Sequence, residues 1–120
     1  MYASFKIIKC VVVHETRGDI EEIEIDLLPE RNEIANLLGG NATFLGQWED
    51  EFVVILTRAN TENLELNANK LPRPFTNMRI FGKILLIRMD EESEPKDFKL
   101  WEYKTMVENS TPRTRRSMDL

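Results

Sequence analysis

The fold is decided by the stretch Arg79-Ile-Phe-Gly-Lys-Ile-Leu-Leu-Ile-Arg-Met-Asp90, which has the pattern of a long β-strand. Successive side chains of a strand point to opposite faces of a sheet. The apolar residues here fall on both faces, with Ile80, Ile84 and Leu86 on one side and Phe81, Leu85 and Ile87 on the other. Such a strand belongs in the middle of a sheet that is covered on both sides. Gly82 interrupts the run and indicates a bulge, or a close approach by another backbone or a ligand.

Two antiparallel hairpins are predicted before this strand. Residues 5–14 form a β-branched run that is apolar on both faces, and residues 20–27 alternate between apolar and acidic side chains. The short link Thr16-Arg-Gly-Asp19 leaves no room for a crossover between them. Residues 43–48 and 52–57 form the second hairpin, on either side of an acidic turn.

Two helices complete the set of elements. Pro29 suits the first helical position, and the pair Gly39-Gly40 ends that helix, with one glycine in the left-handed C-cap conformation. The second helix covers about residues 98–108, with Asp97 as its N-cap. On this helix Trp101 points away from the apolar face.

The 120 residues are therefore expected to form an α+β domain over residues 1–109, followed by a flexible basic tail, residues 110–120. Its sheet is predicted to be mostly antiparallel, curled and five-stranded, partly barrel-like, and to carry the two helices. Residues 58–78 show no periodicity and contain two prolines, which predicts a long irregular connection. Connections of this length in a small domain are often functional.

The charge distribution bears on the class of partner. The net charge is −5, and the tail carries three arginines against one acid, so the domain itself is more acidic than the whole chain. An acidic surface repels phosphate backbones. The domain is therefore not expected to bind nucleic acid, and the alternative is an accessory role in nucleic-acid or nucleotide binding through the basic tail or a pocket near Gly82.

No residue pattern supports catalysis, a metal site or a cofactor. His14 is the single histidine, and a histidine at a strand end is more often structural than catalytic. Cys10 is the single cysteine and falls in an apolar strand, so we expect a buried thiol. The clustered acids are typical of a solvated surface, and the alternative interpretation is a loose site for a divalent ion. We predict no catalytic residues, no metal and no cofactor.

Several segments resemble a small domain family of unknown function found in phages. The resemblance is carried by Ile34-Ala-Asn-Leu-Leu-Gly-Gly40, Phe52-Val-Val-Ile-Leu-Thr57, Asn69-Lys-Leu-Pro72, Phe81-Gly-Lys-Ile-Leu-Leu86 and Leu100-Trp-Glu-Tyr103. The later part of the chain, including Leu71-Pro-Arg-Pro-Phe75, is also similar to hypothetical proteins of algae and of the large DNA viruses of algae. The resemblance covers about residues 20–108, and it implies a viral or algal origin without assigning an activity.

The predicted function is that of a virus-encoded, non-enzymatic module that binds a protein partner, which is a host protein if the chain is viral. The candidate binding residues lie in the second hairpin, the long connection and the last helix: Trp48, Asn67, Asn69, Arg73, Phe75 and Trp101. In the tail, Thr111 and Ser117 are candidate modification sites, since Thr111 precedes a proline and Ser117 follows arginines. The sequence shows no signal peptide and no membrane-spanning run, so a cytoplasmic location, in the host cell if the chain is viral, is expected.

Overall fold

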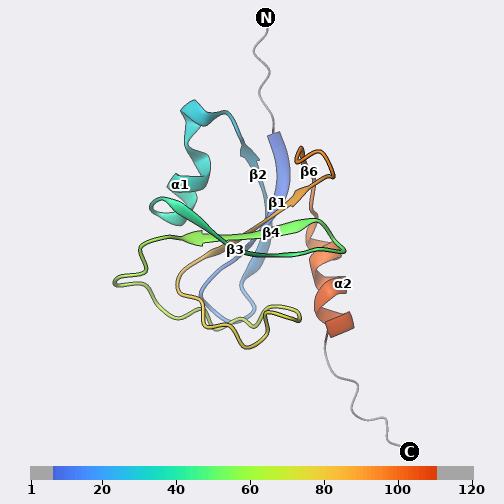
Figure 1. The fold of residues 1–120 in the computed structure, drawn as a ribbon. Coiled ribbons are helices and arrows are strands. Elements are labelled where there is room, and N and C mark those ends of the chain that lie inside the picture. Colours follow the sequence, from blue (N-terminus) through green and yellow to red (C-terminus); the bar gives the residue numbers. More distant parts are fainter. Residues whose placement is uncertain (1–6, 111–120) are drawn as a thin grey trace, which may run out of the picture.

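The computed structural model describes residues 7–110, which form an antiparallel sheet and two α-helices (Figure 1). The strand order is β2 (Ile20–Asp26), β1 (Ile7–Val13), β5 (Ile84–Met89), β4 (Val53–Arg58) and β3 (Ala42–Trp48). A two-residue strand, β6 (Pro95–Lys96), pairs with the end of β5. The sheet is not closed into a barrel, and the α+β fold class is confirmed.

The central strand is β5, as its two apolar faces predict. It pairs with β1 on one side and with β4 on the other, while β2 and β3 form the two ends of the sheet. The side chains of Ile84, Leu85 and Leu86 are completely buried. Ile84 and Leu86 belong to one hydrophobic cluster, and Leu85 and Ile87 belong to another on the opposite face.

A different layer covers each face of the sheet. The helix α1 (Glu33–Leu38) contributes Leu38 to the cluster around Leu85. The helix α2 (Leu100–Ser110) contributes Tyr103 to the cluster around Leu86, together with residues of the long connection between β4 and β5. Burial on both faces explains why β5 is apolar throughout.

The central strand is shorter than predicted, because it begins at Ile84 and not at Ile80. Gly82 has a left-handed φ of 85°, and Phe81 forms only an isolated bridge with Leu66. A Cβ atom at Gly82 would lie 2.9 Å from Cδ1 of Leu64, so the glycine permits close packing by a side chain. The space next to Gly82, proposed above as a pocket, is thus occupied by Leu64.

The helix starts also differ from the prediction. Pro29 begins a 3₁₀ turn, η1 (Pro29–Arg31), and α1 starts only after Asn32, whose φ of 53° breaks the helical path. Gly39 ends α1 in the left-handed conformation, as predicted.

The predicted cap of α2 is wrong. Asp97 accepts a hydrogen bond from the backbone N–H of Lys9 at 2.9 Å. The free N–H groups at the start of α2 are instead satisfied by two glutamates: Leu100 donates to Glu22 of β2, and Lys99 donates to Glu102, each at 2.9 Å.

The helix α2 extends to Ser110, two residues beyond the predicted end at residue 108. The candidate modification sites Thr111 and Ser117 lie outside the described residues. Within residues 7–110, no helix is both long enough and apolar enough to span a membrane.

Candidate functional site

A groove of about 560 Å³ lies between three elements that are distant in sequence. Its walls are the β3–β4 turn, the segment 72–74 of the long connection, and the outer face of α2. Three predicted binding residues line it, namely Trp48, Arg73 and Trp101. Figure 1 shows the β3–β4 turn beside the upper part of α2, and the long connection below the sheet.

Trp48 joins the turn to the long connection. Its indole N–H is shared between the carbonyl oxygens of Pro72 and Arg73, at 3.3 and 3.0 Å. The ring of Phe75 meets Trp48 edge-on, with 5.4 Å between ring centroids, and it packs so closely over Gly46 that a Cβ there would lie 2.8 Å from the ring. Only 6% of Trp48 is exposed, so Trp48 and Phe75 form the framework of the groove.

Arg73 joins the connection to the end of α2. Its backbone N–H donates to Oγ of Ser110 at 2.7 Å, and its peptide bond to Pro74 is cis. The side chain of Arg73 is exposed, and no carboxylate among residues 7–110 forms an ion pair with it. The guanidinium is therefore available to a ligand.

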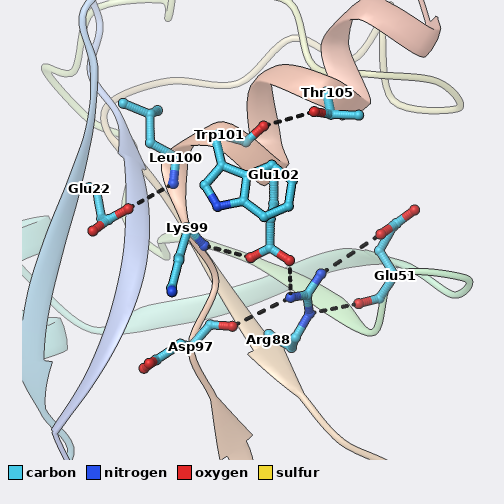
Figure 2. A network of polar contacts seen from close by, with 9 residues as sticks. All are labelled: Glu22, Glu51, Arg88, Asp97, Lys99, Leu100, Trp101, Glu102 and Thr105. Carbon is cyan, nitrogen blue, oxygen red and sulfur yellow. Dashed lines mark hydrogen bonds and ion pairs between the residues drawn. The ribbon is translucent and has the colours of Figure 1, made fainter.

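Arg88, at the end of β5, joins the turn to the start of α2 (Figure 2). Its guanidinium donates to the carbonyl of Glu51 at 3.2 Å and to the carboxylate of Glu102 at 2.8 Å, and it lies 3.7 Å from the carboxylate of Glu51. It also lies over the ring of Phe98, 5.0 Å from the centroid. Partial burial would raise the pKa of Glu102, but the hydrogen bonds from Arg88 and from the backbone of Lys99 hold that pKa below its ordinary value.

Trp101 is the most exposed large apolar side chain of the described residues, with 65% of its surface accessible. It projects from the first turn of α2, next to Glu102 (Figure 2). Glu102, Thr105, Met106, Asn109 and Ser110 line the groove with it. Sequence reasoning missed these five residues, although their spacing marks one face of a helix that includes Trp101.

Asn67 and Asn69 lie elsewhere and hold the long connection against the first hairpin. The buried amide of Asn67 donates to the carbonyls of Val13 and Gly82, at 3.1 and 2.9 Å, and accepts from the N–H of Asn69. The side chain of Asn69 donates to the carbonyls of His14 and Thr16 and accepts from the N–H of Gly18. Their polar groups are therefore engaged within the protein.

Neither Cys10 nor His14 lines the groove. Cys10 is buried, and burial, followed by the charge of Glu22, raises the pKa of its thiol to about 12. Nε2 of His14 pairs with the carboxylate of Glu21 at 2.6 Å. Among residues 7–110, no three His, Cys, Asp or Glu side chains are grouped so that they could hold a metal ion.

Comparison with protein families adds a classification. Residues 11–106 match the model of a family of unknown function, DUF5880. The chain belongs to the DUF5880 family. The match covers all three walls of the groove up to Met106, so these walls are part of the DUF5880 domain. No curated protein and no solved structure matches the chain.

Proposed function

We propose that this DUF5880 domain is a virus-encoded, non-enzymatic module that binds a protein partner through the groove beside α2. The observation that carries the proposal is the exposure of Trp101 above a groove whose walls are already fixed. Tryptophan and arginine are the residues most enriched at energetic hot spots of protein interfaces. Trp101 and Arg73 supply one tryptophan and one arginine to the lining of the groove.

The walls of the groove support this proposal because hydrogen bonds already hold them in place in the free protein. Trp48 fixes the long connection against the turn, Arg88 fixes the turn against α2, and Ser110 fixes the end of α2 against Arg73. A surface that is rigid before binding loses less conformational entropy in the complex.

The exposed indole gives the size of the expected contribution. Burying the exposed part of a tryptophan removes roughly 150 Å² from water, which at about 25 cal/mol per Å² is worth roughly 4 kcal/mol as an upper bound. Part of this is offset by ordering of the partner, so the replacement Trp101→Ala should weaken binding by about 2 to 3 kcal/mol, or about 30- to 150-fold in Kd.

The viral origin is supported only by the resemblance of segments such as residues 34–40 and 81–86 to phage and algal-virus proteins. With it we propose a cytoplasmic site of action in the host cell and a host protein as the partner. Detection of the chain only in infected cells would support this part of the proposal, and its detection in uninfected cells would reject it.

The test is affinity capture from the native cell lysate with tagged protein, followed by mass spectrometry. Trp101→Ala and Arg73→Ala should lose the captured partner and keep the wild-type melting temperature. The matched control is Phe44→Ala, because Phe44 is 58% exposed on β3 but does not line the groove. Equal capture by wild-type protein and by Trp101→Ala would reject the groove as the binding surface.

The same experiment separates protein binding from the competing role in nucleic-acid binding. That role would act through the basic tail, which lies outside the described residues apart from Ser110. Capture that survives nuclease treatment and depends on Trp101 supports a protein partner. Retention of RNA or DNA on a filter at low salt, lost steeply as salt rises, would favour nucleic acid instead.

A further inference from the structure

We propose that residues 111–120 of the same chain occupy the groove in the free protein and compete there with the partner. This inference rests on the proposed function in one respect, namely that the groove is a docking surface. It identifies the first occupant as a basic segment of the chain itself.

The position of Ser110 provides the first argument. Ser110 is the last described residue, it lines the groove, and it is held there by the N–H of Arg73. The sequence after Ser110 is therefore covalently attached to a residue that lines the groove.

The length of the segment is sufficient to return along α2. From Ser110 back to Trp101 the helix is about 14 Å long, at 1.5 Å per residue. An extended chain covers up to about 3.4 Å per residue, so the third to sixth residues after Ser110 can reach about 10 to 20 Å away. The residues in this range include Arg113, Arg115 and Arg116.

Charge complementarity provides the third argument. The groove also carries Glu49 and Asp50, which are exposed and form no ion pair among residues 7–110. The neighbouring carboxylates of Glu51 and Glu102 are already paired with Arg88. Arg73, whose backbone N–H donates to Ser110, is the positively charged residue of the lining. A segment with three arginines is complementary in charge to the unpaired carboxylates of Glu49 and Asp50.

Trp101 adds a contact suited to arginine in particular. A guanidinium stacks on the face of an indole, and an exposed cation–π contact of this kind is modest in strength. The groove therefore offers an arginine-containing segment both an aromatic surface and two free carboxylates.

The test uses the full chain throughout and follows the backbone amides of Glu49 and Asp50 and the indole N–H of Trp101 by NMR. In the variant Arg113→Gln/Arg115→Gln/Arg116→Gln these signals should move away from their wild-type positions. Addition of a synthetic peptide of residues 111–120 to this variant should return them. A short linker gives an effective concentration on the order of 1 mM, so occupancy within the chain requires a Kd of the peptide of about 0.1 to 1 mM.

Two variants serve as test and control for the role of Glu49 and Asp50. Glu49→Gln/Asp50→Asn should weaken binding of the peptide at least fivefold. Glu91→Gln/Glu92→Gln removes two exposed charges from the β5–β6 turn, outside the groove, and should leave binding of the peptide unchanged. Identical signals in the wild type and the triple arginine variant, or a peptide Kd well above about 1 mM, would overturn the inference.

The outcome for the partner distinguishes this inference from the proposed function. If both are correct, the triple arginine variant captures several times more partner than the wild type. Equal capture that still depends on Trp101, with no movement of the signals, would reject the inference and leave the proposed function standing. Binding of the peptide without any Trp101-dependent partner would support the inference and reject the proposed function.

Discussion

The replacement Asn67→Ala tests whether the long connection is held by one buried amide. Asn67 is 8% exposed, and its side chain makes three hydrogen bonds: two join the connection to Val13 of β1 and to Gly82 before β5, and the third, from the N–H of Asn69, lies within the connection. A typical hydrogen bond contributes about 1 kcal/mol net, so the loss of all three should lower the free energy of unfolding by about 3 kcal/mol. For a domain of this size that corresponds to a fall of about 12 °C in Tm.

The assay is thermal unfolding followed by circular dichroism. Asn77→Ala is the matched control, because Asn77 is exposed in the same connection and makes no side-chain hydrogen bond within residues 7–110; its Tm should stay within about 2 °C of the wild type. Asn67→Asp keeps the shape of the side chain but replaces the amide nitrogen by an oxygen, which would face the carbonyl oxygens of Val13 and Gly82. This variant should also have a lower Tm than the wild type. A wild-type Tm for Asn67→Ala would refute the structural role of this amide.

Four further predictions concern the groove, the core and the proposed occupant. Arg88→Gln should lower the free energy of unfolding by about 2 kcal/mol in urea titrations and weaken partner capture, since it releases the turn from α2. Gly46→Ala should destabilise by about 1 to 3 kcal/mol in the same titrations, because its Cβ would collide with Phe75. Burial raises the pKa of the Cys10 thiol from 9.0 in the unfolded chain to about 12 in the folded protein, so the unfolded state loses this proton first. The free energy of unfolding should therefore fall as pH rises above 9, by up to about 1.4 kcal/mol per pH unit. The variant Cys10→Ala should show a smaller fall per pH unit. A peptide of residues 111–120 phosphorylated on Ser117 should bind the groove more weakly than the unmodified peptide in the NMR titration, since the added negative charge opposes Glu49 and Asp50. A wild-type urea midpoint for either of the first two variants, a flat pH profile for the wild type, or tighter binding of the phosphopeptide would contradict the corresponding prediction.

Much of the fold follows from periodicity. The apolar faces of residues 80–87 predict the central strand, and the acidic alternation of residues 20–27 predicts a strand with one solvent-exposed face, which the structure places at an end of the sheet. The errors occur where distant contacts override local signals. Asp97 is a residue type that often caps helices, yet its carboxylate accepts a hydrogen bond from the backbone N–H of Lys9. The N–H of Leu100 in α2 donates instead to Glu22, which lies in a strand almost eighty positions earlier in the sequence. The two-residue β6 is too short to leave a pattern.

The site was predictable only in part. Trp101 could be identified because it falls off the apolar stripe of its helix, and Arg73 because it lies between two prolines. The roles of Asn67 and Asn69 could not be read in advance, since an asparagine in a connection has the same local pattern whether it faces a partner or a buried carbonyl. The single charge at the end of an apolar strand, Arg88, was the available signal for the network that fixes the groove.

The central position of β5 has a consequence for biosynthesis. The hairpins β1–β2 and β3–β4 pair with each other only through β5, which follows both of them in the chain. During translation, the edge of each hairpin that pairs with β5 therefore stays exposed to solvent until β5 has left the ribosome. Contacts between segments so far apart in sequence form slowly. During this interval the apolar, unpaired edges of β1 and β4 in the nascent chain can bind chaperones or associate with other copies of the chain.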